Sequence, residues 1–194
     1  MFSSPLVLQI PSSMQMTDEQ FFEFCQVNRD LRIERKKSGE LLIMPPTGSE
    51  TGNRAGNISG QLWVWSEQDG TGITFDSSTG FKLSTGANRS PDASWIKLER
   101  WNSLSPKQQE KFAPICPDFV VELKSPSDNL QILKEKMEEY MNEPGIQLGW
   151  LIDRKQRQVY IYRPGLPKEC LDNPASVSGE LVLPGFILNM SKIW

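Results

Sequence analysis

The 194-residue sequence contains no histidine. This absence excludes Ser-His-Asp and Cys-His catalysis, the HExxH metalloprotease motif and any imidazole general base. Hydrolysis by this chain would therefore depend on carboxylates, on lysine, or on a metal ion held by oxygen ligands.

Cysteine is scarce, and no two cysteines lie close together in the sequence. Cys25, Cys116 and Cys170 are odd in number and form no CxxC pair. Such usage supports neither a disulfide framework nor a zinc site. We expect three reduced thiols in core or surface positions.

Long apolar runs and an excess of positive charge are also missing. No run approaches the roughly 18 residues of a membrane span, and the N-terminal stretch MFSSPLVLQIPSS lacks the basic, long-apolar pattern of a signal peptide. We therefore expect a cytoplasmic protein with no membrane partner. The formal net charge of -3 argues against a wholly basic surface but leaves nucleic-acid binding open, because basic side chains can be segregated locally.

The remaining composition is that of a globular protein. Hydrophobic residues make up 38% of the chain and charged residues 23%, which is ordinary for a folded domain. The length is sufficient for one sizeable core. Since no linker, repeat or low-complexity segment interrupts the chain, we expect a single domain over residues 1–194.

Several stretches follow helical spacing or carry helix-start signals. They are residues 17–30, 50–68, 105–112 and a segment that begins near Asp128. Thr17 with Gln20 forms a capping box, and Ser127 or Asp128 is the expected cap of the last helix. The apolar stripe of that last helix consists of Leu130, Leu133, Met137 and Tyr140.

Strand and turn signals fill most of the remaining chain. Hairpins are predicted over residues 31–46 and 146–165, strands and turns over 72–98, and a small closing hairpin over 166–190. Helices and strands that alternate in this way predict an α/β fold with a mixed central sheet flanked by helices. We expect five tryptophans in the core rather than as base-stacking platforms: Trp63, Trp65, Trp95, Trp101 and Trp150.

The stretch PDFVVELKSPSD contains an apolar strand with two charges in its middle. Because side chains alternate along a strand, Glu122 and Lys124 share one face, while Phe119, Val121 and Leu123 take the other. Burying unpaired charge in an interior strand costs several kcal/mol, roughly. The two charges therefore need a partner or a function.

A second carboxylate near Glu122 would give the pair a chemical purpose. Converging carboxylates repel each other, and a divalent cation with oxygen ligands relieves the repulsion. Such a cation can activate water for attack on a phosphodiester, and Lys124 points the same way as Glu122. The ExK tripeptide alone is not specific, since many exposed strands contain it.

Asp92 supplies the context. It lies in SPDASWI, at the start of a probable strand thirty positions before Glu122. A Pro-Asp followed by an apolar strand with ExK resembles the PD-(D/E)xK nuclease superfamily, whose fold is restriction-endonuclease-like. From Thr17 to Met190 the chain resembles the largely cyanobacterial Uma-two family, through the ordered motifs GSETG, SPDASWI, PDFVVELKSPSDNLQ, KMEEYMNEPGIQLGWLID and VYIYRPG.

The resemblance implies roles for individual residues. Asp92 and Glu122 would hold Mg²⁺ or Mn²⁺, Lys124 would be the catalytic lysine, and Glu50 would be the acidic residue contributed by a core helix. Many Uma-two relatives have an apolar residue in place of this lysine, so Lys124 makes the chain more nuclease-like. They often have a histidine just after the acidic residue, where this chain has Thr51.

Each of these positions also has a plain structural interpretation. Glu122 and Lys124 would form a buried ion pair, and Glu50 would only complement a helix N-terminus. Two further residues are possible members of the site. Gln131 would face the metal from the first turn of the last helix, and Lys136 would either approach the site or lie on a solvated helix face.

The leading hypothesis is a Mg²⁺- or Mn²⁺-dependent nuclease that acts on DNA and pairs as a homodimer. One alternative is a catalytically inactive binding or regulatory module that retains the fold. Another is a metal-dependent hydrolase of a smaller phosphate ester.

Overall fold

The central feature is a six-stranded sheet in the order β11-β10-β9-β8-β7-β4, seen in a computed structural model that describes residues 5–194. Its strands are β4 (Gly72–Asp76), β7 (Ala93–Lys97), β8 (Phe119–Lys124), β9 (Leu148–Asp153), β10 (Gln158–Tyr162) and β11 (Glu169–Asp172). The pair β8–β9 is parallel and its neighbours are antiparallel. The predicted mixed sheet is therefore confirmed.

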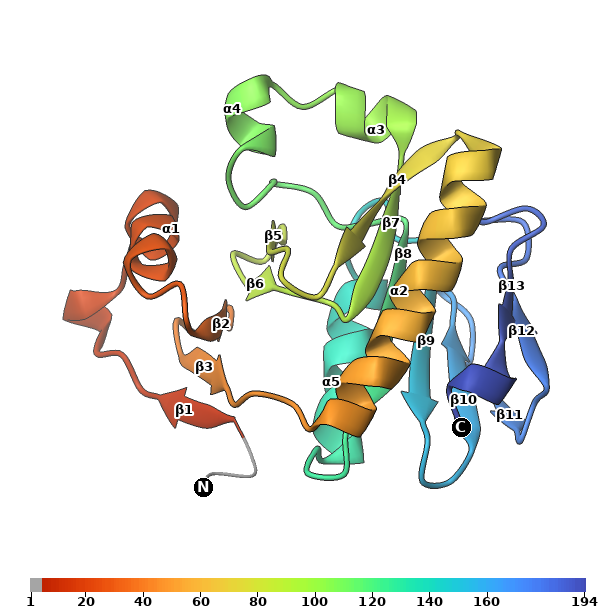
Figure 1. Ribbon diagram of the computed structural model, residues 1–194. Coiled ribbons are helices and arrows are strands. Elements are labelled where there is room, and N and C mark those ends of the chain that lie inside the picture. The colour runs from red at the N-terminus through yellow and green to blue at the C-terminus, as the bar shows by residue number, and fades with distance from the viewer. Residues whose placement is uncertain (1–4) are drawn as a thin grey trace.

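Strand β8 lies inside this sheet, between β7 and β9, and its side chains alternate as predicted. Phe119, Val121 and Leu123 pack into a core that includes Ile58 from a long helix, α2 (Ser49–Asp69). On the other face, Val120 packs against residues of α5 (Leu130–Met141). Glu122 and Lys124 share that second face, so α5 covers the charged side of the strand (Figure 1).

A second sheet was not anticipated as a unit. It has the order β1-β3-β2-β6-β5 and is formed by β1 (Leu6–Leu8), β2 (Arg32–Arg35), β3 (Leu41–Met44), β5 (Phe81–Lys82) and β6 (Asn88–Arg89). The predicted hairpin over residues 31–46 is its β2–β3 part. The short strands β5 and β6 carry only two residues each, too few for an alternation pattern to reveal them.

Most helix boundaries follow the local signals. Helix α1 (Asp18–Val27) begins with the predicted Thr17–Gln20 capping box, α3 (Leu98–Asn102) follows β7, and α4 (Pro106–Gln109) begins after a Ser105 capping box. The predicted cap of α5 was wrong. Asn129 caps it, accepting hydrogen bonds from Gln131 and Ile132, while Asp128 accepts one from the Ser125 amide.

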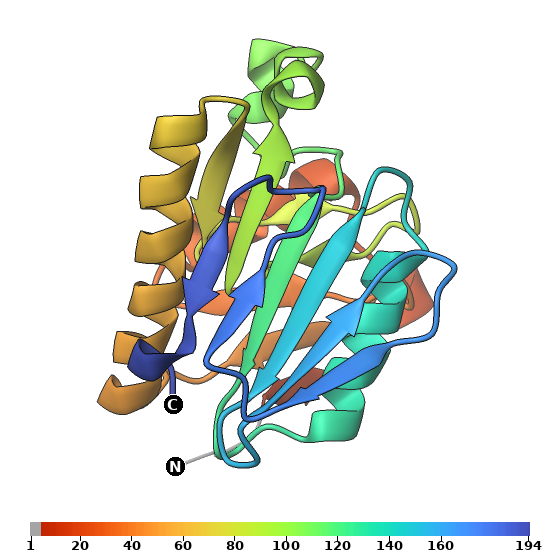
Figure 2. The same cartoon turned by 90° about the vertical axis from the view of Figure 1, so that its right-hand side faces the viewer.

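The C-terminal segment closes one face of the large sheet. It forms the predicted hairpin, β12 (Ser176–Ser178) with β13 (Ile187–Asn189), which is followed by a 3-10 turn at Met190–Lys192. A second 3-10 turn, at Ser12–Met14, precedes α1. Figure 2 shows this hairpin and α2 in front of the sheet and α5 behind it. Trp95 and Trp150 are buried as expected, but the prediction was wrong for Trp63, which is 55% exposed because it lies on the outer face of α2. Among the described residues, no helix combines the length and apolarity needed to cross a membrane.

Candidate active site

Asp92 and Glu122 are brought together by the pairing of β7 with β8. The amide of Asp92 donates to the carbonyl of Val121 at 3.0 Å, and its Oδ2 accepts from the amide of Leu123 at 2.8 Å. The two carboxylates are close enough for the charge on Asp92 to raise the pKa of Glu122. The structure therefore brings Asp92 and Glu122 near each other, and their binding of one cation stays a prediction.

Glu122 is almost fully buried on the face that α5 covers. Its Oε1 lies 2.8 Å from Nζ of Lys136 and accepts a 3.2 Å hydrogen bond from the hydroxyl of Tyr140. Burial raises the pKa of Glu122 to about 7; Lys136 opposes this shift, while the charges on Asp92 and Glu34 add to it. The carboxyl group therefore titrates near neutral pH.

Glu122 is one end of an ion-pair chain that joins the two sheets. The chain runs Glu122–Lys136–Glu34–Arg89–Glu139, with successive N–O distances of 2.8, 2.8, 3.0 and 2.6 Å. These side chains come from β8, β2, β6 and α5. Charges of opposite sign alternate along it, so each interior charge has a partner on both sides.

Lys136 and Glu34 form the buried centre of the ion-pair chain. Burial alone would raise the pKa of Glu34, but Lys136 and Arg89, with the amide of Ser90, hold it at about 2. Burial alone would lower the pKa of Lys136, but Glu122 and Glu34 raise it. Lys136 therefore stays an ammonium ion between two carboxylates.

Arg32 lies beside this centre, at the more exposed edge of the site. Its Nη2 is 3.3 Å from Oδ1 of Asp92 and donates to the carbonyl of Ser90 at 3.0 Å. Burial lowers the pKa of Arg32, but the charges on Asp92, Glu122 and Glu34 outweigh that effect and raise it. With Lys124, which shares the strand face of Glu122, four acidic and four basic side chains gather here, so their formal charges balance.

Lys124 is half-buried and lies on the same strand face as Glu122, two residues further along β8. Its Nζ is 3.4 Å from the carbonyl of Ser125, and in the described part of the chain it forms no ion pair with Glu122. The cation that neutralises Glu122 is Lys136. The plain structural alternative, an ion pair within the ExK tripeptide, was wrong.

Glu50 and Gln131 are placed elsewhere. The Glu50 carboxylate is 69% exposed and pairs with Arg154 at 2.8 Å and with Arg54 at 4.0 Å. Gln131 is exposed and donates to Glu135 on its own helix. Over residues 5–194, no hydrogen bond or ion pair joins either side chain to Asp92 or Glu122.

The sequence analysis missed Glu34, and it allowed Lys136 a place on a solvated face. Glu34 lies in the charged stretch RIER, which is typical of an exposed strand, yet it is 1% exposed. Lys136 follows Glu135 in a charged helix, yet its side chain is only 10% exposed. One signal was available: Lys136 lies one helical turn from the stripe residues Leu133 and Tyr140, and so near the buried face.

The oxygen donors at this site suit a hard divalent cation. Asp92 and Glu122 present carboxylates to one region, and within the described residues Oε2 of Glu122 accepts no hydrogen bond. No group of three or more Asp, Glu, Cys or His residues that could hold a metal is present in residues 5–194. A pair of carboxylates is nevertheless enough for Mg²⁺, which keeps several waters and takes further ligands from substrate phosphate. The donor set therefore fits such an ion.

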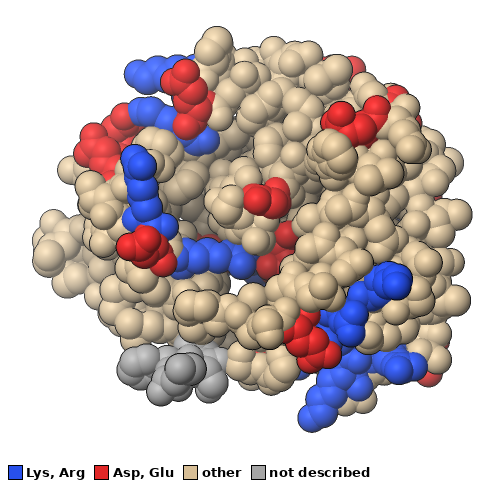
Figure 3. Space-filling view, in the orientation of Figure 1, with Lys and Arg blue, Asp and Glu red and all other residues tan. Residues whose placement is uncertain are grey.

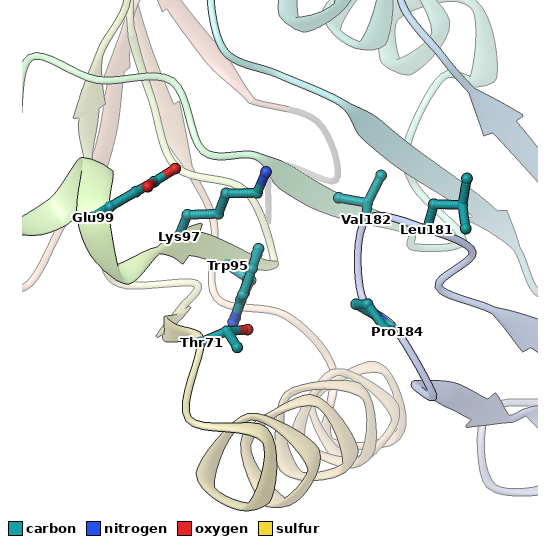
Figure 4. Close-up of a pocket in the computed structure, with 7 residues that line it drawn as sticks. All are labelled: Thr71, Trp95, Lys97, Glu99, Leu181, Val182 and Pro184. Atoms are coloured by element: carbon teal, nitrogen blue, oxygen red, sulfur yellow. The ribbon is translucent and has the colours of Figure 1, made fainter.

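Figure 3 shows a hollow in the middle of the face viewed in Figure 1, where acidic and basic side chains meet between the two sheets. Two other cavities contain none of the site residues. One, of about 370 Å³, is lined by Trp95, Lys97 and Leu181 among others (Figure 4). A groove of about 750 Å³ runs along α2 beside Phe186 and Ile187.

Comparison with known proteins agrees with the fold. The chain resembles a crystal structure titled as a "putative nuclease belonging to DUF820" from Anabaena variabilis ATCC 29413, with 18% sequence identity and a TM-score of 0.71. The match covers 92% of this chain and 97% of the other, and it shows a shared fold. No curated protein matches. The model of the Uma2 family, described as "Putative restriction endonuclease", matches residues 18–191, so the chain belongs to the Uma2 family.

Proposed function

We propose that this protein is a Mg²⁺- or Mn²⁺-dependent nuclease that hydrolyses phosphodiester bonds in DNA. The observation that carries the proposal is the meeting of Asp92 with the buried Glu122, beside lysines from two different elements. Family membership supports a nuclease-like function. Carboxyl groups with strongly shifted pKa values cluster at functional sites, and burial raises the pKa of Glu122 to about 7.

In this proposal Asp92 and Glu122 hold the cation. When bound, the cation supplies Lewis acidity toward a phosphate oxygen and toward water. In this proposal Oε2 of Glu122, which accepts no hydrogen bond within the described residues, takes a proton from the attacking water. Removing that proton makes the water a better nucleophile toward phosphorus.

The two lysines have separate tasks. Lys136 is fixed between Glu34 and Glu122 and keeps the buried carboxylates compensated. Lys124 is half-buried, makes no ion pair in the described residues, and lies on the same face. We assign Lys124 to contact with a phosphate oxygen, where an ammonium stabilises the charge that develops in the transition state. Neither role is assigned to Glu50 or Gln131.

A cleavage assay tests this function. Supercoiled plasmid and single-stranded DNA are incubated with the protein in Mg²⁺, in Mn²⁺ and in EDTA. We expect nicking in either metal and none in EDTA. Asp92→Asn and Lys124→Ala should each reduce the rate at least about a hundredfold, the scale of one lost transition-state donor, while Gln131→Ala should leave it unchanged.

The assay also separates the main alternative. A binding or regulatory module that retains the fold would bind DNA but cleave it in neither metal, and Lys124→Ala would change nothing. A hydrolase of smaller phosphate esters would turn over a chromogenic phosphodiester but leave plasmid intact.

We further propose a homodimer, because two sites related by a two-fold axis can reach both strands of a duplex. The dimer is tested by light scattering at a protein concentration of about tens of micromolar. The mass of a monomer at that concentration would contradict the proposal.

A further inference from the structure

Four basic side chains lie near the ends of β8 and β9, and Lys124 among them borders the candidate site. They are Lys124, Lys155, Arg157 and Lys192, and we refer to them as the basic corner. Lys155, Arg157 and Lys192 are exposed, and Lys124 is half-buried. In the part of the chain that the structure describes, none of the four has a carboxylate oxygen within 4.0 Å of its charged nitrogens.

Backbone contacts bring these residues together from three separate segments. Lys124 is the register partner of Asp153, so the turn after β9 begins beside it. Arg154 in that turn donates to the carbonyl of Ile193 at 3.1 Å, and Arg54 on α2 donates to the carbonyl of Lys192 at 3.1 Å. Figure 3 shows Lys and Arg side chains gathered at the lower right, where Figure 1 places the start of α2 and the β9–β10 turn.

The β9–β10 turn is shaped to present its basic side chains to solvent. Oδ1 of the buried Asp153 accepts from the amides of Lys155 and Gln156, and the amide of Arg157 donates to the carbonyl of Arg154. Arg157 has a φ of 53°, the left-handed conformation that closes such a turn. The buried carboxylate thus fixes the backbone while Lys155 and Arg157 stay exposed.

Nearby acidic groups cancel only part of this charge: the exposed Asp172 is the register partner of Gln158, which follows Arg157 in the chain. Glu50 is exposed at the start of α2, but its carboxylate pairs with Arg54 and Arg154, which are additional to the basic corner. Asp153 is buried in the turn. The N-terminus of α2 adds positive potential, since Gly48 caps the 21-residue helix without a side-chain hydrogen bond. The corner is therefore positive on a chain whose formal net charge is -3.

We propose that the basic corner holds the phosphodiester backbone of a nucleic acid and so positions it over the candidate site. This rests on the proposed function for the nature of the polymer. Contacts with phosphates position a nucleic acid without reading its sequence, and they release condensed counterions. Lys124 belongs to both the corner and the site, so it is the residue that would link a strand held at Lys155 and Arg157 to the site.

Salt-dependent binding tests the proposal without any cleavage. Labelled duplex DNA, single-stranded DNA and RNA of one sequence, each about 30 nucleotides long, are titrated in EDTA between about 50 and 200 mM NaCl. The corner variant combines Lys155→Gln, Arg157→Asn and Lys192→Gln; Asn tolerates the positive φ at residue 157. The control variant combines Lys37→Gln, Lys107→Gln and Lys168→Gln, which are exposed and remove the same charge elsewhere.

We expect wild-type binding to weaken with salt. The slope of log K against log salt should decrease by about 0.9 for each lost contact with a duplex, or about 0.7 with a single strand. The control variant should keep the wild-type slope. The three polymers show which nucleic acid the corner prefers. If the triple variant does not fold, as judged by circular dichroism, Lys155→Gln and Lys192→Gln are compared singly with Lys168→Gln.

The possible results separate the corner from the enzyme. The proposed role of the basic corner is overturned if the corner and control variants lose binding equally, or if the wild type binds none of the polymers. A corner-specific loss of slope without cleavage in Mg²⁺ or Mn²⁺ supports the corner and refutes the nuclease. Cleavage with an unchanged slope in the corner variant refutes the corner and leaves the nuclease standing.

Discussion

Lys136 and Glu122 form a 2.8 Å ion pair that fixes α5 to β8 within the core of the protein. The same ammonium lies 2.8 Å from Oε1 of Glu34, on the other sheet. A single lysine therefore neutralises two buried carboxylates from two sheets. In doing so it occupies the kind of position, between acidic groups, that a bound cation would also favour.

The first prediction concerns removal of that ammonium. Lys136→Met should lower the free energy of unfolding by about 3 to 5 kcal/mol, because it leaves Glu122 buried without a cation and Glu34 with Arg89 alone. Glu122→Gln in the Lys136→Met background should recover part of the loss, since one of the two charges is then absent. Urea denaturation of the single and double variants measures this coupling. Additive effects of the two substitutions would show that the pair carries no interaction energy.

Metal binding gives the second prediction. At a concentration about a hundredfold above its dissociation constant, Mg²⁺ or Mn²⁺ should stabilise the wild type by about 2.7 kcal/mol, a shift of a few degrees in Tm. Asp92→Asn and Glu122→Gln should each remove most of that rise. Lys124→Ala should retain it, because an ammonium does not ligate the cation.

The same melting assay tests whether Lys136 competes with metal. In Lys136→Met the metal-induced rise in Tm should exceed that of the wild type, because the cation then also compensates carboxylates that lost their lysine. Arg54→Met, which removes an arginine that pairs with Glu50, serves as the control and should show the wild-type rise. If millimolar metal shifts the Tm of neither the wild type nor Lys136→Met, the metal-dependent function is refuted.

Local signals in the sequence were sufficient for part of this site. The alternation in Phe119–Lys124 placed Glu122 and Lys124 on one face, because it depends on residues a few positions apart. The capping box at Thr17 is equally local, which is why the start of α1 was predicted. The pairing of Asp92 with Glu122 was expected from the resemblance to the PD-(D/E)xK superfamily and from no local signal.

The ion-pair chain could not be predicted in the same way. Glu34 and Lys136 are 102 residues apart, and each lies in a charged stretch whose periodicity is that of a solvated surface. Their burial results from the packing of the five-stranded sheet against α5, a tertiary contact with no local signature. The hydrogen bond from Tyr140 to Glu122 was not predicted either, because Tyr140 fits the apolar stripe of a helix and its sequence context does not indicate a polar partner.

The third prediction concerns pH. Because the pKa of Glu122 rises from 4.5 to about 7 on folding, the folded protein binds more protons than the unfolded chain between these values. The free energy of unfolding should therefore fall as pH rises through this window, by up to about 1.4 kcal/mol per pH unit. In Glu122→Gln the free energy of unfolding should depend less on pH between about pH 5 and pH 8. Near pH 8, roughly, the variant should be more stable than the wild type.

Glu34 should contribute with the opposite sign, because its pKa is lowered from 4.5 to about 2. Its stabilising effect is complete above pH 4.5 and is lost as the pH falls toward 2. Denaturation below pH 4.5 should thus be less steep in Glu34→Gln, whereas Glu122→Gln should leave that acid limb in place. If Glu122→Gln shows the same dependence of unfolding free energy on pH as the wild type above about pH 5, the raised pKa of Glu122 is contradicted.

The last prediction distinguishes the two Pro-Asp pairs of the chain. Asp118, after Pro117, is fully buried; its carboxylate accepts from Arg100 at 2.7 Å, from the amide of Lys97 at 3.0 Å and from Gln147 at 2.8 Å. These three donors hold the Asp118 carboxylate in place within the fold. Asp118 precedes β8, at the opposite end of the strand from Lys124. Arg100→Met should therefore lower the free energy of unfolding by about 3 kcal/mol, since it leaves a buried carboxylate without its cation.

The matched variant at the other pair is Arg32→Met, which removes the cation beside Asp92. Arg32 is 36% exposed, so its loss should disturb folding less than the loss of Arg100 does. It should, however, strengthen Mn²⁺ binding, because it removes a positive charge beside Asp92 and Glu122. Titration calorimetry at a temperature where both variants are folded compares the two. A change in Mn²⁺ affinity in Arg100→Met but not in Arg32→Met would place the metal at Asp118 and contradict the site proposed at Asp92.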